Sequence, residues 1–295
     1  MDPRRVNEVI TDVEEFQVRG LTGTVKKVRI GERTIDYWAP PRPGNRVLVA
    51  HDGQNVLDKR NIGINPHQRA TWELGRSSRR AAELHGETPP TLICIYHTPY
   101  TENPLGRVTE YTPERYMNLK ENWLIERYGL FGGDISDVIE NLSADAFVNQ
   151  ICNQIVPEIT SRIGQVVEPR KTAILGASMG GLAAIYAAII RPDFFHTSLS
   201  FSPHWVIGGD SLAEKMMTDF PLPGIHKLWM SRGTKGLDSK YEQSQDYANL
   251  LIQKRGYRQD GDLITRTLTD GAHTNATWAR YVPAALDFWF KGVRK

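Results

Sequence analysis

A long uncharged stretch, residues 173–190, constrains the fold of this chain more than any other feature. It is long enough for a membrane-spanning helix, which needs about 18 apolar residues or more. However, small residues that favour a turn stand at its centre: Gly176, Ser178, Gly180 and Gly181. We therefore predict a buried strand and a buried helix that are joined by a tight turn.

Strand and helix patterns alternate along most of the chain. Two strand patterns at 23–30 and 33–39 are separated by a short turn, which predicts a hairpin. Residues 46–50 contain a continuous apolar run, typical of a strand that is buried on both faces of a sheet. The order predicts an α/β fold, with a mostly parallel central sheet, helices on both faces and an N-terminal antiparallel hairpin. Further strands are expected at 91–96, 171–175, 197–201, 227–231 and 263–268, and helices at 67–85, 143–163, 179–190, 239–255 and 274–290.

We expect a single domain over residues 1–295, with two irregular inserts at about 97–140 and 203–224. In such folds ligands bind at the carboxyl ends of the strands, where these inserts emerge. The inserts are therefore predicted to form a lid or pocket wall for a bulky acyl or aryl group, unless their rings simply pack together. They carry the following large side chains: Tyr100, Tyr111, Tyr116, Trp123, Tyr128, Phe131, Trp205 and Met216.

The charge balance argues against a nucleic acid or a membrane as partner, because 36 Lys and Arg against 34 Asp and Glu leave a net charge of only +2. We interpret the basic residues 76–80 (RSSRR) as a solvated helix face. The first ten residues are charged and lack a signal-peptide core, which favours a cytoplasmic protein. Cys94 and Cys152 fall in strand and helix patterns, and we expect small buried side chains rather than a disulfide.

Residues 176–180 (GASMG) have the form G-x-S-x-G. In this motif a serine occupies the apex of a sharp turn between a strand and a helix, with its oxygen exposed. The flanking glycines remove side chains that would otherwise collide. The motif predicts Ser178 as a nucleophile; the alternative is a small-residue turn that packs a helix on the sheet.

A serine hydroxyl needs an adjacent base. In folds that carry this turn, the catalytic residues follow the chain order serine, acid, histidine. We favour His273, because it lies in the turn after the last predicted strand, with His204 as the rival. His196 and His226 precede strands and therefore belong to the opposite edge of the sheet.

The acid is expected after the strand at 227–231. Asp238 is the favoured candidate and Glu242 the alternative. Ser239 and Glu242 have the S-x-x-E spacing of a capping box, which would give Glu242 a structural function.

Acyl transfer also needs two N–H donors for the oxyanion of its tetrahedral intermediate. One is the N–H of Met179, next after the predicted nucleophile. The other is expected from the loop at 51–58, where Gly53 permits a tight turn.

Several segments together resemble the putative esterase family, which includes enterochelin-esterase-like and esterase-D-like α/β-hydrolases. The segments are 47–58, 107–113, 144–159, 176–181, 201–205 and 271–278. The resemblance implies that Ser178 is the nucleophile, that His273 is its histidine and that the N–H groups of Gln54 and Met179 bind the oxyanion.

The family acid usually follows a Gly-Thr pair closely, whereas here Lys235, Gly236 and Leu237 separate Gly233-Thr234 from Asp238. The resemblance thus leaves three possibilities for the catalytic acid: Asp238, Glu242, or no acid, with a serine–histidine pair acting by itself. The resembling segments also supply the expected substrate-binding residues: Asp52, Gly53, Arg107, Glu110, Tyr111 and Trp205.

The predicted function is a serine carboxylic-ester hydrolase that forms an acyl-enzyme and acts on a bulky, aryl or siderophore-like ester. An acyltransferase with the same residues and a non-catalytic binding protein are the alternatives. No cofactor is expected, and scattered histidines without a C-x-x-C pair give no metal-site pattern. Arg107, Arg115 and Arg127 could contact an acidic ligand, or be ordinary surface arginines. The sequence determines neither the physiological ester nor the oligomeric state.

Overall fold

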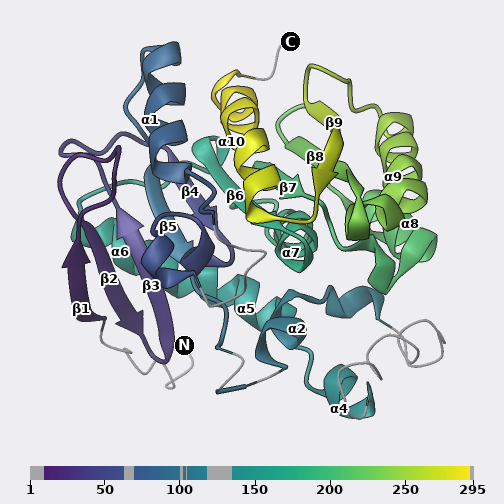
Figure 1. The fold of residues 1–295 in the computed structure, drawn as a ribbon, viewed down its shortest axis with the longest axis horizontal. Helices are drawn as coiled ribbons and strands as arrows, with labels where there is room; N and C mark the ends of the chain where they lie inside the picture. Colours follow the sequence, from purple (N-terminus) through teal and green to yellow (C-terminus); the bar gives the residue numbers. More distant parts are fainter. Residues whose placement is uncertain (1–9, 63–69, 100–101, 104, 118–134, 293–295) are drawn as a thin grey trace.

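The computed structural model describes residues 10–62, 70–99, 102–103, 105–117 and 135–292 (Figure 1). Within these ranges, nine strands form one sheet in the order β1-β2-β3-β5-β4-β6-β7-β8-β9. The strands are β1 Thr11–Phe16, β2 Val25–Ile30, β3 Arg33–Trp38, β4 Val47–Ala50, β5 Thr91–Ile95, β6 Thr172–Ala177, β7 Thr197–Phe201, β8 Lys227–Lys235 and β9 Leu263–Ala272.

The strand directions confirm the predicted α/β class. The pairings from β5 through β4, β6, β7 and β8 to β9 are all parallel, whereas β1, β2, β3 and β5 pair antiparallel. β4 is buried along its whole length, as expected of a strand covered on both faces. β1 was not predicted, because every residue of this edge strand except Phe16 is exposed and it carries no hydrophobic alternation.

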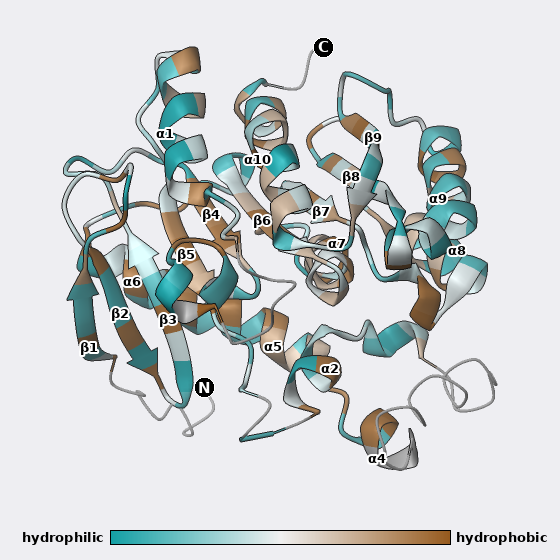
Figure 2. Cartoon of the chain, viewed as in Figure 1, coloured by the Kyte–Doolittle hydropathy of each residue, from teal (hydrophilic) through white to brown (hydrophobic). Residues whose placement is uncertain are grey.

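Helices cover both faces of the sheet. α1 packs against α10 on one face, and α5, α7, α8 and α9 contribute to the apolar core on the other. Figure 2 shows apolar colouring concentrated in the central strands and in α7, with hydrophilic colouring on the outer surfaces of α1 and α9. The α-helices are α1 Leu74–His85, α2 Gly106–Tyr111, α4 Ile135–Glu140, α5 Ala144–Gln150, α6 Val156–Arg162, α7 Met179–Ile190, α8 Gly209–Asp219, α9 Glu242–Lys254 and α10 Asn275–Phe290.

The helix predicted at 143–163 is divided by a π-helical turn. α5 and α6 flank this turn, which spans Ile151–Ile155. Pro157 lies just after it, and a proline inside a helix lacks an N–H and collides with the carbonyl group four residues earlier. The wider π turn accommodates the proline without ending the helix.

The two inserts and the starts of two helices also differ from the predictions. The insert at 203–224 is not irregular, because it contains α8, and the insert at 97–140 contains α2 and α4. α1 begins at Leu74, after a segment that includes residues 63–69 outside the described ranges. α9 begins at Glu242, because Gly236–Tyr241 forms a 3-10 turn.

The long uncharged stretch divides as predicted into β6 and α7. Among the described helices, none is both long and apolar enough to cross a membrane. Cys94 and Cys152 are free and buried, as expected.

Candidate active site

The turn between β6 and α7 has the sharp geometry predicted from the G-x-S-x-G motif. Ser178 at its apex has φ +59° and ψ −126°, a rare conformation for a residue with a side chain. A Cβ atom on Gly176 would lie 2.0 Å from the carbonyl oxygen of Gly180. The backbone N–H of Ser178 donates to the carbonyl oxygen of Phe201 at 2.9 Å and ties the turn to the end of β7.

Three side chains that follow β6, β8 and β9 form one hydrogen-bonded series. The Nε2 atom of His273 lies 2.9 Å from the Oγ atom of Ser178. The Nδ1 atom of His273 lies 2.6 Å from the Oδ1 atom of Asp238. Ser178 follows β6, Asp238 lies in the 3-10 turn after β8, and His273 follows β9, so the carboxyl edge of the parallel sheet brings them together.

Asp238 is completely buried, and its second oxygen is held by two further donors. The Oγ atom of Ser202 donates to Oδ2 at 2.7 Å, and the backbone N–H of Gly233 donates to it at 2.6 Å. Trp278 Nε1 in turn donates to Ser202 Oγ at 3.0 Å. A buried carboxylate without such partners would be strongly destabilising, so these donors make the position of Asp238 possible.

Glu242, the alternative acid, points elsewhere. Its side chain is 66% exposed and pairs with Arg232 at 2.8 Å. It does not form the predicted capping box, because the hydroxyl of Ser239 donates to the carbonyl oxygen of Gly236. Of the two candidates, the structure brings only Asp238 to His273.

The other histidines that the sequence analysis considered lie in different places relative to Ser178. His204 lies near the series, with its ring centre 6.4 Å from that of His273, but its Nδ1 atom lies 2.6 Å from the hydroxyl of Tyr241. His196 and His226 lie against each other with ring centres 4.7 Å apart, next to the start of strands β7 and β8, as predicted. The imidazole of His273 lies against the Ser178 hydroxyl, whereas the backbone N–H of His204 donates to the Ser178 carbonyl oxygen at 3.2 Å.

Aromatic rings fix the orientation of the His273 imidazole. Trp278 meets it edge-on at 5.0 Å between ring centres, and Tyr241 meets it edge-on at 5.7 Å. Sequence reasoning did not assign functions to Ser202, Tyr241 or Trp278. Ser202 and Trp278 lie within segments that carry the family resemblance, which was the available signal.

The loop after β4 lies directly against the serine turn. The N–H of His51 donates to the carbonyl oxygen of Leu175 at 2.9 Å, which extends the pairing of β4 with β6. A Cβ atom on Gly180 would lie 3.0 Å from the carboxylate of Asp52. Gly53 is required here, because a Cβ atom would lie 2.4 Å from the backbone of Cys94. In the described part of the chain, the N–H groups of Gln54 and Met179 have no backbone acceptor.

Helix α2 holds this loop in place. Arg107 pairs with Asp52 through two hydrogen bonds of 2.7 and 2.8 Å, and the N–H of Asp52 donates to the hydroxyl of Tyr111 at 3.1 Å. Burial opposes ionisation of Asp52, but the charge and hydrogen bonds of Arg107 outweigh it and hold its pKa below the ordinary value. Glu110 on the same helix pairs with Arg33 at 2.9 and 2.5 Å.

Several predicted substrate-binding residues are therefore engaged within the protein. Asp52 and Arg107 bind each other, and Glu110 binds Arg33. Tyr111 and Trp205 are completely buried, and Trp205 Nε1 donates to Gln245 at 2.9 Å, so neither ring offers a surface to a ligand.

The remaining side chains that were predicted to contact a ligand are buried, paired within the protein or outside the described residues. Tyr116 and Met216 are buried in the core, which supports packing rather than a lid. Arg115 pairs with Asp145 at 2.8 Å. Tyr100, Trp123, Arg127, Tyr128 and Phe131 lie outside the described residues.

Comparison with known proteins identifies the family of this chain. A family model described as "Putative esterase" matches residues 128–286, more than half of the chain. The chain belongs to the putative esterase family. The uncharacterized protein YbbA from Bacillus subtilis is 28% identical to it over 221 residues, which cover 73% of each chain.

Solved structures share its fold. The BES protein from Bacillus cereus has a TM-score of 0.61 at 17% identity, over 94% of this chain and 99% of that one. The enterobactin esterase FES from Shigella flexneri has a TM-score of 0.57 at 15% identity, and the match covers 95% of this chain but only 59% of the FES chain. Identities this low establish the α/β-hydrolase fold alone.

Replacing Gly176 by Ala should prevent the serine turn from closing, because the new methyl group would overlap the Gly180 carbonyl. We expect a loss of unfolding free energy of about 3 kcal/mol or more, measured by chemical denaturation. Gly292→Ala is the matched control, since a Cβ atom there meets nothing within 4 Å, and should stay within about 0.5 kcal/mol of the wild type. Equal midpoints for the two variants would contradict the close approach of the two glycines.

His51 should make the protein less stable in acid. Burial lowers the pKa of His51 to about 4, from an unfolded value of 6.5. The unfolded chain therefore binds the proton more readily, so stability is lost as the pH falls from 6.5 towards 4, by about 3 kcal/mol in total. Denaturation at a series of pH values should show a smaller acid loss for His51→Leu. Burial also lowers the pKa of His196 to about 4, so His196 contributes the same acid-dependent loss of stability to the wild type and to the variant. Identical pH slopes would show that His51 is not buried as described.

Proposed function

We propose that this protein is a serine carboxylic-ester hydrolase that works through an acyl-enzyme. The observation that carries the proposal is the continuous series Asp238–His273–Ser178, with contacts of 2.6 and 2.9 Å. A completely buried carboxylate at one end and a nucleophile on a tight turn at the other are the arrangement that this chemistry needs.

In the first half-reaction, Ser178 Oγ attacks the carbonyl carbon of the ester while His273 Nε2 accepts the hydroxyl proton. Asp238 accepts a hydrogen bond from Nδ1–H, which fixes the tautomer and stabilises the imidazolium that forms. The tetrahedral oxyanion would accept hydrogen bonds from the N–H groups of Gln54 and Met179. Two features support this role: the groups have no other backbone acceptor in the described part of the chain, and their loops touch at Gly180 and Asp52.

The intermediate then collapses, and the imidazolium of His273 gives its proton to the leaving alkoxide, so the alcohol departs and an acyl-serine remains. In the second half-reaction, the same imidazole takes a proton from water, whose oxygen attacks the acyl carbon. A second collapse returns the proton to Ser178 Oγ and releases the acid. Each half-reaction begins and ends with a neutral His273, so the cycle consumes one ester and one water and releases one alcohol and one acid.

For substrates, we propose bulky esters, either aryl esters or siderophore-like esters. The support is the fold shared with the enterobactin esterase FES. A screen of short acyl, aryl and macrolactone esters tests this class. Product analysis with added acceptor alcohols identifies an acyltransferase, because transfer to the alcohol would then exceed release of the free acid.

Ser178→Ala should abolish turnover of a p-nitrophenyl ester, with kcat/KM reduced by about a thousandfold or more, because no acyl-enzyme can form. The control is Ser161→Ala, an exposed serine on α6, which should leave kcat/KM unchanged. Undiminished turnover by Ser178→Ala, in protein with the thermal midpoint of the wild type, would end the catalytic proposal.

Asp238→Asn should reduce kcat by about a thousandfold to ten-thousandfold, because an amide cannot hold the imidazole in the required tautomer. Glu242→Gln should have little effect, since the Glu242 side chain is largely exposed and bonded to Arg232. Comparison of kcat for the two variants therefore tests the assignment of the acid. A larger loss in Glu242→Gln, or no loss in Asp238→Asn, would overturn it.

A further inference from the structure

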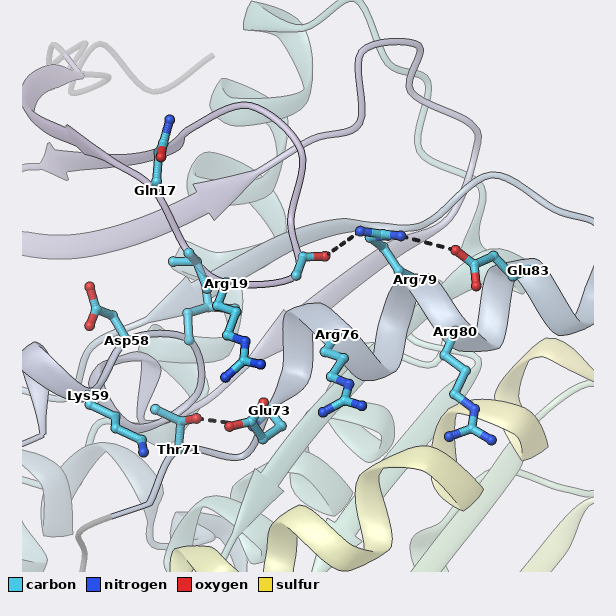
Figure 3. A pocket seen from close by; sticks show the side chains of 13 residues that line it. Gln17, Arg19, Asp58, Lys59, Thr71, Glu73, Arg76, Arg79, Arg80 and Glu83 are labelled. Carbon is cyan, nitrogen blue, oxygen red and sulfur yellow. Dashed lines mark hydrogen bonds and ion pairs between the residues drawn. The ribbon is translucent and has the colours of Figure 1, made fainter.

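A hollow of about 870 Å³ lies apart from the serine–histidine series (Figure 3). Its walls come from three places: the segment after β1, the loop that follows the Gln54 turn, and the exposed side of helix α1. The lining residues include five cations and three carboxylates: Arg19, Lys59, Arg76, Arg79 and Arg80, and Asp58, Glu73 and Glu83.

Four of the cations have no carboxylate partner in the described ranges. Arg79 binds Glu83 and the carbonyl oxygen of Gly20, and Asp58 binds Arg60, so these charges are already compensated. No ion pair joins the remaining cations to the Glu73 carboxylate or to any other described acid. They are Arg19, Lys59, Arg76 and Arg80, and Figure 3 shows them reaching into the hollow from the loops and from the helix.

The backbone beneath these side chains is firmly fixed. Arg79 donates to the Gly20 carbonyl oxygen at 2.9 Å, which ties the segment after β1 to helix α1. Gly75 lies so close to Leu21 that a Cβ atom would approach its side chain to 2.8 Å. On the other side, the N–H of Trp72 donates to the carbonyl oxygen of Asn55 at 3.2 Å. The flexible cations therefore stand on fixed walls, which reduces the entropy that a ligand must overcome.

Repulsion within this group favours a bound anion. Arg76 and Arg80 are four residues apart on α1 and share one face, a spacing at which like charges destabilise a helix. Guanidinium groups bind carboxylate and phosphate oxygens through paired hydrogen bonds, so one ligand with several such oxygens can join cations from different walls. The sequence indicated a solvated helix face here, and Arg76 and Arg80 are exposed as expected; all three arginines of residues 76–80 also line the hollow.

We propose that this hollow binds a multivalent oxyanion, a ligand with at least two carboxylate or phosphate groups. The arginines that sequence analysis suggested for an acidic ligand are less suitable, because Arg107 and Arg115 are already paired with Asp52 and Asp145. The binding claim stands apart from the proposed catalysis, since no lining residue belongs to the serine–histidine series.

The hollow nevertheless borders the loops of the candidate active site. Leu57 follows Gln54 by three residues, and Trp72 Nε1 donates at 2.9 Å to Asn275, two residues after His273. The anion could therefore be the acidic part of an ester that extends from Ser178, or a separate small molecule. Both have the same oxyanion chemistry, and kinetics can distinguish them.

Inorganic pyrophosphate is the probe, titrated calorimetrically into the full chain at low ionic strength, where screening is weak. Arg76→Gln/Arg80→Gln should raise Kd about tenfold or more. The control Arg29→Gln/Arg42→Gln removes the same charge from two exposed arginines outside the hollow and should change Kd less than twofold. Glu73→Gln should tighten binding about threefold, because it removes the competing carboxylate. Absence of binding, or equal weakening in both double variants, would overturn the proposal.

Kinetics then identifies the source of the anion. If the hollow holds part of the substrate, Arg76→Gln/Arg80→Gln should lower kcat/KM about tenfold for an ester with a dicarboxylate substituent and leave a neutral p-nitrophenyl ester unaffected. If the anion is a separate molecule, pyrophosphate binds and neither ester distinguishes the variant from the wild type. Ser178→Ala protein should bind pyrophosphate normally, so loss of catalysis and loss of binding are separately observable.

Discussion

The buried carboxylate of Asp238 is the interaction on which the candidate active site depends. It accepts hydrogen bonds from His273, Ser202 and Gly233, and Ser202 accepts one from Trp278. Ser202 and His273 directly follow β7 and β9, Gly233 lies in β8 and Trp278 in α10, so one charge connects several elements. Each hydrogen bond to a charged group contributes about 1.5–3 kcal/mol, whereas an unpartnered carboxylate in the same place would cost several. The proposed function and the local stability therefore depend on the same atoms.

A second ionic contact supports the other half of the site. The pair between Asp52 and Arg107 fixes helix α2 on the loop that carries Gln54, and Tyr111 accepts the Asp52 N–H beside it. Arg107 and Tyr111, which the sequence analysis expected to contact a ligand, instead hold the loop after β4 in place. Arg107 is the clearest case, because it donates two hydrogen bonds to the buried carboxylate of Asp52.

Sequence patterns predicted the parts of the fold that depend on periodicity and on tight turns. The buried strands were predicted correctly because continuous apolar runs are typical of strands covered on both faces. The Ser178 turn was predicted correctly because its backbone leaves no space for a side chain at Gly176. β1 was not predicted because nearly all of its residues are exposed, so its sequence shows no alternation of apolar and polar residues.

The sequence favoured Asp238 but left Glu242 open, since the outcome depends on how the 3-10 turn at 236–241 and the start of α9 orient the two side chains. The hollow beside α1 could not be predicted from the sequence either. The run of arginines in its sequence does not say which guanidinium groups find a carboxylate and which do not.

The parallel sheet also has a consequence for the order in which the molecule is made. Ser178 is synthesised about a hundred residues before His273 and Trp278, and the strand that delivers the histidine is the last of the sheet. A chain synthesised only as far as α7 contains Ser178 but lacks His273. The proposed chemistry therefore requires the last strand and the residue that follows it.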